Sequence, residues 1–280
     1  MIKVALPNKG QLFEPTVELL TSCGYRLSKT PKSLSSLDPD NGVEFYFLRP
    51  GDIPLYVANG VLDAGITGKD LAAEKGSGEE PLLDLNYGYS RLCAAVLDTA
   101  PYRTLEDIGA VRIATSFPVI TQRYYGEKPL RLTELEGAVE ISVRLGIADA
   151  VVDVVETGST LEQAGLRIVG EPLFRSNAAL FAQRGHEDRD AVQILRSRIE
   201  GRLVAYEYRM VEYDCPAELL EQATKITPGI ESPTVSALQR EGWLAVKAMV
   251  KKNRANQIMD ELARLGCKGI LLTTIDSARI

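Results

Sequence analysis

The sequence contains a single histidine, His186, and four cysteines that stand far apart, with no CxxC pair among them. This histidine stands alone in a polar stretch that predicts a surface position, so we expect neither a Ser–His nucleophilic site nor a histidine-based metal site. Isolated cysteines are typical of small buried side chains in a reducing cytoplasm rather than of a disulfide framework. Any catalysis must therefore depend on carboxylates, cationic side chains, backbone dipoles or a metal ion that arrives with the substrate.

Long apolar runs are also absent, at the N-terminus and elsewhere, so we expect neither a signal peptide nor a membrane span. The formal net charge of −6 argues against a general nucleic-acid or membrane-surface binder, which needs a basic face. A small polyanionic ligand in a locally basic cleft stays possible. A chain of 280 residues with 45% hydrophobic residues predicts two or three domains with a substantial core. His186 lies in the polar stretch "QRGHEDRD", which predicts an ordinary surface histidine.

The first half of the chain alternates short β-branched runs with helical patterns, which is typical of parallel α/β units. Two stretches in it resemble each other: "DIPLYVANGVLDAGITGKDL" and "AVEISVRLGIADAVVDVVETGSTL". Their alignment pairs Gly60 with Gly146 and Asp63 with Asp149. We therefore expect two similar lobes, each contributing a loop at a strand end to a ligand cleft, although chance similarity between two βα units is the alternative.

The last part of the chain has a different order of elements. Residues 209–280 alternate as βαββαβ, the ferredoxin-like pattern, and carry no evident chemistry, so we expect a regulatory or oligomeric domain. We assign residues 1–90 to the first lobe and residues 91–177 to the second. A helical stretch within about 178–208 is expected to return the chain to the first lobe.

The stretch "DVVETGSTL" (153–161) is the strongest candidate for a binding site. An apolar strand leads into it, Gly158 permits a tight turn, and a helix pattern follows. Thr157, Ser159 and Thr160 offer hydroxyls and backbone donors at the helix start. The loop lacks the lysine of GxxxxGK[ST] and the spacing of GxGxxG, so it is neither a Walker A loop nor a dinucleotide fingerprint. It predicts a cup for a phosphate monoester, with Asp153 and Glu156 near sugar hydroxyls or a magnesium ion.

Three shorter motifs follow strands of the first lobe. "PNKG" places Lys9 and Gly10 before a helix, where they could hold a phosphate, although a solvated turn lysine is the alternative. "FLRPGDI" places Arg49 at a strand end, where it could bind a phosphate or pair with the nearby Asp52. "ITGKD" offers the backbone of Thr67 and Gly68, followed by Asp70. This aspartate could bind a sugar hydroxyl or an adenine amino group, or only cap a helix.

Taken together, separated blocks in a fixed order resemble the long form of ATP phosphoribosyltransferase over essentially the whole chain. The resemblance implies a two-lobed core of the type II periplasmic-binding-protein kind, followed by a ferredoxin-like (ACT-like) domain that binds histidine. It further implies transfer of a phosphoribosyl group from 5-phosphoribosyl diphosphate to N1 of ATP with Mg²⁺, the first step of histidine biosynthesis, under feedback inhibition by histidine. A cytoplasmic homo-oligomer, a dimer that assembles to a hexamer, is also implied. The blocks are "VALPNKG", "VEFYFLRPGDIPLYV", "LDAGITGKDL", "LEGAVEISVRLG", "IADAVVDVVETGSTL" and, in the tail, "TPGIESPTVSAL" and "NQIMDELARLGCKGIL".

The resemblance also assigns residues. Lys9, Arg49 and Asp153 are the expected catalytic residues, and Mg²⁺ would be held mainly by the substrate diphosphate, with help from Glu140 or Asp153. The residues expected on each ligand are, for 5-phosphoribosyl diphosphate, Glu140, Asp153, Glu156, Thr157, Gly158, Ser159, Thr160 and Leu161; for ATP, Lys9, Gly10, Arg49, Thr67, Gly68 and Asp70; and for histidine, Asp214, Ser232, Thr234 and Gly269, where a small residue such as Ala is expected at position 269.

Two other functions compete with this one. Prephenate dehydratase joins a similar core to a similar tail, but its Thr-Arg-Phe motif is absent, and "IESPT" only loosely matches its Glu-Ser-Arg-Pro effector motif. A solute-binding protein or a transcriptional effector domain is the non-enzymatic alternative. The missing signal peptide argues against the first, and a strand that begins at residue 2, in place of a helix-turn-helix, argues against the second.

Overall fold

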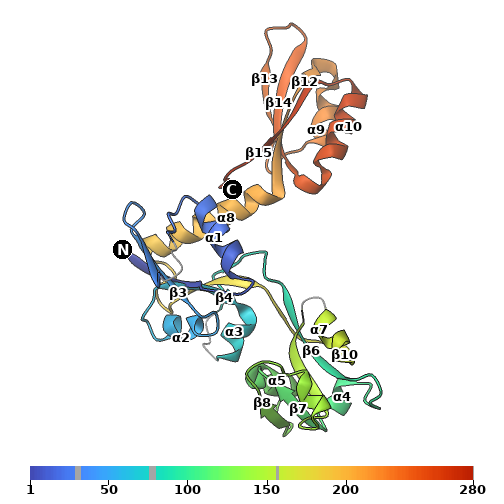
Figure 1. Cartoon of the computed structure of the whole chain (residues 1–280). Helices are drawn as coiled ribbons and strands as arrows, with labels where there is room; N and C mark the ends of the chain where they lie inside the picture. The colour runs from blue at the N-terminus through green and yellow to red at the C-terminus, as the bar shows by residue number, and fades with distance from the viewer. Residues whose placement is uncertain (29–32, 76–79, 156–157, 280) are drawn as a thin grey trace. The chain divides into compact units, whose positions relative to one another are not determined.

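The computed structural model describes residues 1–28, 33–75, 80–155 and 158–279. It divides into two compact units: the first comprises Met1–Thr21 and Tyr25–Arg196, and the second comprises Ser22–Gly24 and Ser197–Ile280. The first unit contains two sheets, which define lobe I and lobe II, and the second contains one (Figure 1). Within the described residues, no helix is both long and apolar enough to cross a membrane.

Lobe I is built on a six-stranded sheet in the order β2-β3-β1-β4-β11-β5. Strand β1 runs parallel to β3 and β4, and β11 is antiparallel to β4. The central strand is buried over Val4–Pro7, which explains its almost continuous apolar sequence. The elements of lobe I are β1 (Ile2–Pro7), α1 (Phe13–Ser22), β2 (Ser35–Asp38), β3 (Val43–Leu48), α2 (Ile53–Ala58), β4 (Ala64–Gly68), α3 (Lys69–Glu74), β5 (Leu83–Asp84) and β11 (Ala178–Ala182).

Lobe II has a five-stranded sheet in the order β10-β6-β9-β7-β8. Strand β7 is parallel to β8 and β9, and β6 is antiparallel to β9, so the sheet repeats the arrangement around β1 in lobe I. Its apolar core gathers on both faces, with Ile113 and Val152 on one and Val151 and Ala114 on the other. The elements are β6 (Ser90–Leu97), α4 (Leu105–Ile108), β7 (Arg112–Thr115), α5 (Pro118–Tyr125), β8 (Arg131–Glu134), α6 (Ile141–Arg144), β9 (Ala150–Val155), α7 (Ser159–Gln163) and β10 (Leu166–Ser176).

The same hydrogen-bond arrangement occurs once within each lobe, and we call it the aspartate clamp. In lobe I, Asp63 donates its N–H to the carbonyl of Lys3 and accepts the Lys3 N–H on its carboxylate, at 2.9 and 2.8 Å. In lobe II, Asp149 does the same with Arg112, at 2.8 and 3.1 Å. The backbone three residues before each aspartate is left-handed, at Gly60 and Gly146. The predicted similarity between the two stretches is therefore a structural repeat, not a chance match.

The second unit contains a four-stranded antiparallel sheet in the order β13-β14-β12-β15. One face of this sheet packs against α9 and α10, and its core includes Tyr213, Val246 and Leu262. This is the predicted ferredoxin-like arrangement, because the first and third strands lie at the centre. Its elements are β12 (Tyr208–Pro216), η1 (Ala217–Leu219), α9 (Leu220–Ile226), β13 (Thr234–Ala237), β14 (Trp243–Lys251), η2 (Lys252–Arg254), α10 (Ala255–Leu265) and β15 (Lys268–Thr274).

A long helix, α8 (Asp190–Glu207), leads from the first unit into the second, and the chain end lies against it. Ala278 donates its N–H to the carbonyl of Gly201 at 3.0 Å. Arg202 donates to the carbonyl of Asp276 at 2.5 Å. A side chain at position 201 would place its Cβ 2.5 Å from the carbonyl oxygen of Ala278, so this glycine is required for the close approach.

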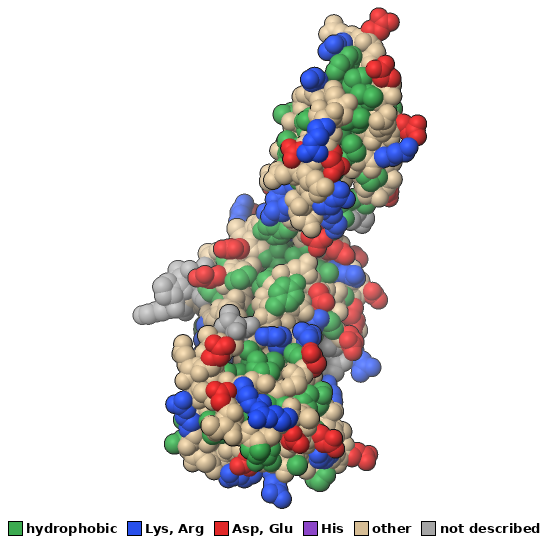
Figure 2. Space-filling view, turned by 90° about the vertical axis from the view of Figure 1, so that its right-hand side faces the viewer, with side chains coloured by type: hydrophobic (Ala, Val, Ile, Leu, Met, Phe, Trp, Pro, Cys, Tyr) green, Lys and Arg blue, Asp and Glu red, His purple; other side chains and the backbone are tan. Residues whose placement is uncertain are grey.

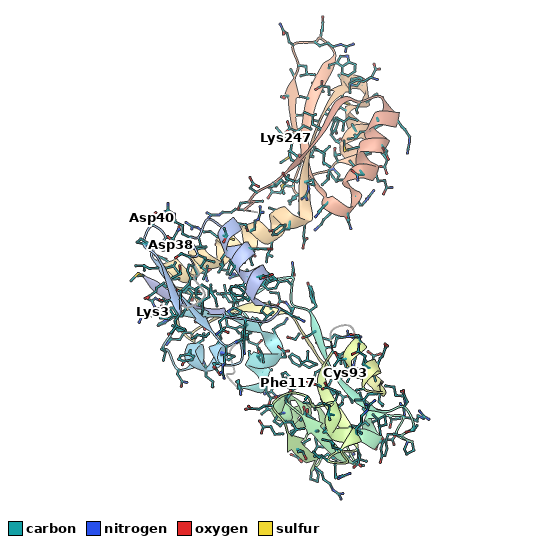
Figure 3. All side chains as sticks on the ribbon, in the orientation of Figure 1. Lys3, Asp38, Asp40, Cys93, Phe117 and Lys247 are labelled. Carbon is teal, nitrogen blue, oxygen red and sulfur yellow. The ribbon has the colours of Figure 1, made fainter. Side chains whose placement is uncertain are left out.

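All four cysteines are free thiols; three are buried, and Cys23 is partly buried. Burial raises the pKa of Cys23 to about 11 and that of Cys267 to about 12. It also raises the pKa of Cys93, which Figure 3 labels in lobe II. These cysteines behave as the small buried side chains that the sequence predicts. His186, expected at the surface, is half-buried with its Nδ1 3.2 Å from the carboxylate of Asp63.

Candidate active site

Two carboxylates line one hollow at the predicted phosphate loop: Asp153 on β9, and Glu140 directly before α6. Asp153 accepts hydrogen bonds from the Val154 N–H at 2.8 Å and from the Ser116 hydroxyl at 3.4 Å. Burial raises the pKa of the Asp153 carboxyl above its ordinary value, and the negative charge of Glu140 adds to this shift. A positive group in this place would therefore be stabilised, since it would relieve the repulsion between two acids.

A hollow of about 360 Å³ opens beside these carboxylates. The structure thus gathers the described residues that the sequence assigns to the sugar diphosphate, except that Leu161 contributes a buried wall rather than a polar contact. Glu156 and Thr157, assigned to the same ligand, lie outside the described residues. The hollow is lined by Gln11, Glu140, Asp153, Val154, Val155, Gly158, Ser159, Thr160 and Leu161.

Gly158 sets the shape of the loop. Its φ of 88° is left-handed, a conformation that residues with a Cβ rarely adopt, and it stands directly before α7. Ser159 and Thr160, the first two residues of that helix, are exposed. Gly158, the N-cap residue of α7, has no side chain with which to cap the helix. Gly158, Ser159 and Thr160 all line the hollow, where a glycine turn followed by a helix start is a geometry that suits an anion.

Two cations follow neighbouring parallel strands of lobe I. Lys9 comes after β1 and Arg49 after β3, and the last residues of these strands, Pro7 and Leu48, are register partners. Both side chains are exposed, as is Gly10. The alternative ion pair between Arg49 and Asp52 is not formed, and neither cation pairs with any acidic residue that the structure describes. Both are available for a polyanion.

The third motif of lobe I is engaged within the protein. Thr67 is fully buried and donates its hydroxyl to the carbonyl of Pro50 at 2.7 Å. Asp70 is 8% exposed; its carboxylate accepts the Leu71 N–H at 2.9 Å and the Ser90 hydroxyl at 3.4 Å. Gly68 is buried as well. Thr67 ties the end of β4 to Pro50, and Asp70 ties the start of α3 to β6. Their assignment to ATP, which stays a prediction, requires the substrate to replace these bonds.

The four residues predicted to bind histidine fall in two places on the sheet of the second unit. Asp214 and Gly269 are neighbours on β12 and β15, since a Cβ at position 269 would lie 3.1 Å from the Asp214 carboxylate. Ser232 and Thr234 line a separate hollow of about 350 Å³ with Lys247 and others. With a φ of 56°, glycine at position 269 keeps this space beside Asp214 free, where the expected alanine would be strained.

Three residues at or near the hollow were not predicted from the sequence: Ser116, Gln11 and Glu74. Ser116 follows β7 within "RIATSFP", which predicted only a strand, and Gln11 lies beyond "PNKG". Glu74 ends α3 and bonds to lobe II, as described below. Ser116 could have been predicted from the repeat, because it directly follows β7 in lobe II as Asn8 directly follows β1 in lobe I.

Metal binding by the chain alone has little support. Within the described ranges, no group of three or more His, Cys, Asp or Glu side chains is placed to hold an ion. Glu140 and Asp153 are only two ligands, which suits an ion whose other ligands come from a substrate.

On the face shown in Figure 2, acidic and basic side chains are interspersed over both units.

Two lobes of mixed α/β structure, joined by the long strands β6 and β10 and carrying a hollow at a strand end, define a two-lobed enzyme of the periplasmic-binding-protein kind, with a ferredoxin-like domain attached. Family models match the chain in the same order. The model described as ATP phosphoribosyltransferase covers residues 49–201, and the one described as the C-terminal domain of HisG covers residues 205–277.

Individual relatives agree with these models. The ATP phosphoribosyltransferases of Salinibacter ruber and Corynebacterium jeikeium are 44% and 45% identical to the chain, with 100% of each chain covered. A solved structure from Thermotoga maritima, titled as an ATP phosphoribosyl transferase (HisG:HisZ) complex, has a TM-score of 0.59 and 29% identity, and covers 71% of this chain and 99% of that one. The chain belongs to the ATP phosphoribosyltransferase family, and is a transferase of histidine biosynthesis. Prephenate dehydratase and the solute-binding alternatives are thereby set aside.

Proposed function

We propose that the hollow beside β9 holds the 5-phosphoribosyl group during its transfer from 5-phosphoribosyl diphosphate to N1 of ATP, with release of diphosphate. The observation that carries this proposal is the coincidence, in one hollow, of an anion cup at Gly158–Thr160 with the carboxylates of Glu140 and Asp153. The cup matches the 5-phosphate, and the carboxylates match the ribose hydroxyls or a cation. Glu156 and Thr157 belong to the same loop.

The reaction requires stabilisation of positive charge on the sugar and negative charge on the leaving diphosphate, and it does not require removal of a proton. Adenine N1 uses its own lone pair to form a bond with the anomeric carbon, while the bond from that carbon to diphosphate breaks and diphosphate leaves with the electron pair. The sugar carries positive charge in such a transition state. Lys9 and Arg49 would hold the phosphates of ATP and the departing diphosphate, with Gly10 lending its backbone. A histidine base is not needed.

We assign Mg²⁺ to the diphosphate of the sugar substrate, with Glu140 or Asp153 as a further ligand. Burial and the charge of Glu140 raise the pKa of Asp153, and a cation beside the two carboxylates would relieve their repulsion. The ion would neutralise the leaving group. In lobe I, Asp70 stays our proposal for the adenine or ribose of ATP, supported from behind by Thr67 and Gly68.

The regulatory part of the proposal concerns residues 209–280, with the catalytic lobes at 1–90, completed by about 178–208, and at 91–177. Histidine would bind near Asp214 and Gly269, and its amino group or imidazole would pair with the Asp214 carboxylate. Ser232 and Thr234, which line a different hollow of the same sheet, stay assigned to the same ligand. From membership of the family, we further propose a cytoplasmic homo-oligomer, in which dimers assemble to hexamers.

Absorbance in the ultraviolet tests the catalytic proposal. Phosphoribosyl-ATP should accumulate when ATP, 5-phosphoribosyl diphosphate and Mg²⁺ are all present, and not when any of the three is left out. No product under excess Mg²⁺ and after removal of histidine would reject the proposed reaction.

Asp214→Ala tests the regulatory proposal in the same assay. We expect weaker inhibition by histidine with little loss of turnover, and retained inhibition would remove Asp214 from the effector site.

A further inference from the structure

Helix α5 of lobe II is capped by a residue of lobe I. The first N–H groups of any helix have no partner within it, and Phe117, the residue before α5, has no side-chain acceptor. Glu74, the last residue of α3, supplies the missing acceptors. Its two carboxylate oxygens accept the N–H groups of Val119 and Ile120 at 2.9 and 3.0 Å. A carboxylate is the group that a helix N-terminus binds best. The sequence separation of 45 and 46 residues makes this a tertiary contact, not a local cap.

The capped end of α5 is tied to the substrate hollow by the segment that precedes it. Phe117, labelled in Figure 3, donates its N–H to the Thr115 hydroxyl at 2.9 Å and accepts the Thr121 hydroxyl at 2.7 Å. The backbone is thus fixed on both sides of Ser116. Ser116 in turn donates its hydroxyl to Asp153, which lines the hollow. A shift of α5 would therefore move the hydroxyl that orients Asp153.

The other end of α3 is anchored where the chain passes between the lobes. Asp70, one turn before Glu74, accepts the Ser90 hydroxyl at the start of β6. The Asp70 N–H donates to the hydroxyl of Ser176 at the end of β10 at 3.0 Å. Helix α3 consequently contacts both connecting strands at its start and α5 at its end, which lets it transmit the relative position of the lobes to the hollow.

We propose that Glu74 is a positioning residue for the sugar-diphosphate site, acting through α5 and Ser116 on Asp153. The inference rests on the proposed function, since it takes the hollow to be that site. Glu74 does not touch the substrate; it sets where the Ser116 hydroxyl stands. A capping role that served stability alone would have no effect on the affinity for one substrate.

Amide hydrogen exchange tests the contact without any substrate. In the full-length chain, Glu74→Ala should speed exchange at the N–H groups of Val119 and Ile120, while Glu18→Ala, an exposed glutamate on α1, should leave both unchanged. Unchanged exchange at both amides in Glu74→Ala would overturn the inference at its first step.

Steady-state kinetics test the consequence. We expect Glu74→Ala to raise the KM for 5-phosphoribosyl diphosphate about tenfold, the loss expected for one strong positioning interaction, with the KM for ATP within about twofold of the parent. Glu74→Gln, which keeps one acceptor oxygen and the shape of the side chain, should raise it by about threefold and guards against misfolding of the alanine variant. Equal changes in both KM values, or no change, would contradict a positioning role.

A double-mutant cycle with Ser116→Ala tests the route. If Glu74 acts through Ser116, the double variant should be no worse than the poorer single variant, whereas multiplied effects would show that the two act independently and would overturn the inference. A parent chain that forms no phosphoribosyl-ATP would instead defeat the proposed function, and the exchange experiment would still report on the contact.

Discussion

Lobe I and lobe II are built from the same unit but use its last loop in different ways. Each has a parallel strand, an aspartate clamp on the neighbouring strand, and a polar turn that opens a helix. In lobe I, the hydroxyl of Thr67 and the carboxylate of Asp70 bond to the protein itself. In lobe II, Ser159 and Thr160 are exposed beside a hollow. The last loop of the repeated unit is thus buried in one copy and lines a hollow in the other.

The largest effect should come from closing the cup of lobe II. Gly158→Val combined with Thr160→Val places a β-branched residue at a left-handed φ and removes a hydroxyl. We expect the affinity for 5-phosphoribosyl diphosphate to fall by at least about 100-fold in calorimetric titration, because hydrogen bonds to a charged phosphate are among the strong ones. The far-ultraviolet circular dichroism should be unchanged. Unaltered affinity would reject the cup assignment, and with it the contrast between the lobes.

The aspartate clamps should behave alike in both lobes. Asp63→Ala and Asp149→Ala each leave a backbone N–H without its acceptor, so each should lower the free energy of unfolding by about 1–3 kcal/mol. Denaturant titration at neutral pH measures both, and the KM values should be unchanged. A large loss in only one lobe would show that the repeat is not energetically equivalent.

The clamp of lobe II also has a defined dependence on pH. Hydrogen bonding to Arg112 lowers the pKa of Asp149 below its unfolded value, so its contribution is present above the unfolded pKa and is lost as the pH falls through the folded pKa. The difference between the parent chain and Asp149→Ala should therefore shrink in acid. A difference that does not change with pH would contradict a clamp made by the charged carboxylate.

Asp153, four residues after this clamp, should show the opposite sign. Its pKa is raised in the folded state, so the charged carboxylate lowers stability at neutral pH, and this penalty disappears as the pH falls below the unfolded pKa. We expect Asp153→Asn to raise the melting temperature at pH 7 by about 2–4 °C while weakening the affinity for 5-phosphoribosyl diphosphate with Mg²⁺ about tenfold. Lower stability together with normal affinity would show that Asp153 is a structural carboxylate.

The smallest change should come from the joint in lobe I. Thr67→Val keeps the shape of the side chain but leaves the Pro50 carbonyl without its donor, at a cost of about 1 kcal/mol in the free energy of unfolding. Thermal unfolding with Thr67→Ser as the control measures this change. If turnover falls much more than stability, Thr67 contacts ATP directly and the joint also serves as a binding loop.

Sequence patterns predicted most of the scaffold because buried strands and strand-end turns leave local signals. The repeat and the ferredoxin-like order were both visible in this way. The strand β11 was not predicted, because five consecutive buried residues, "AALFA", show no alternation that distinguishes a strand. Helix α6 is shorter than "GAVEISVRLG" suggests, and α4 and α5 were missed because four to eight residues carry too weak a period.

The lining of the hollow was predictable where one segment supplies it and unpredictable where several do. Gly158 and Thr160 come from one loop, whose small polar residues predict a tight turn at a strand end. The environment of Asp153 depends on Ser116 and Glu140, from separate loops, and the cap on α5 depends on Glu74, 45 residues away. No local pattern encodes such contacts. Burial is equally non-local, so no local pattern showed that the fold covers Thr67 and Asp70, whose assignment to ATP stays a prediction.

The raised pKa values of the buried cysteines make the chain convenient for optical work. A thiol reacts with maleimide dyes as thiolate, and the pKa of Cys23 at about 11 and that of Cys267 at about 12 keep the thiolate scarce at neutral pH. A dye pair could therefore be attached to two introduced surface cysteines, one on each lobe, without first replacing the native ones. The separation of the lobes could then be followed by energy transfer in single molecules as the substrates are added.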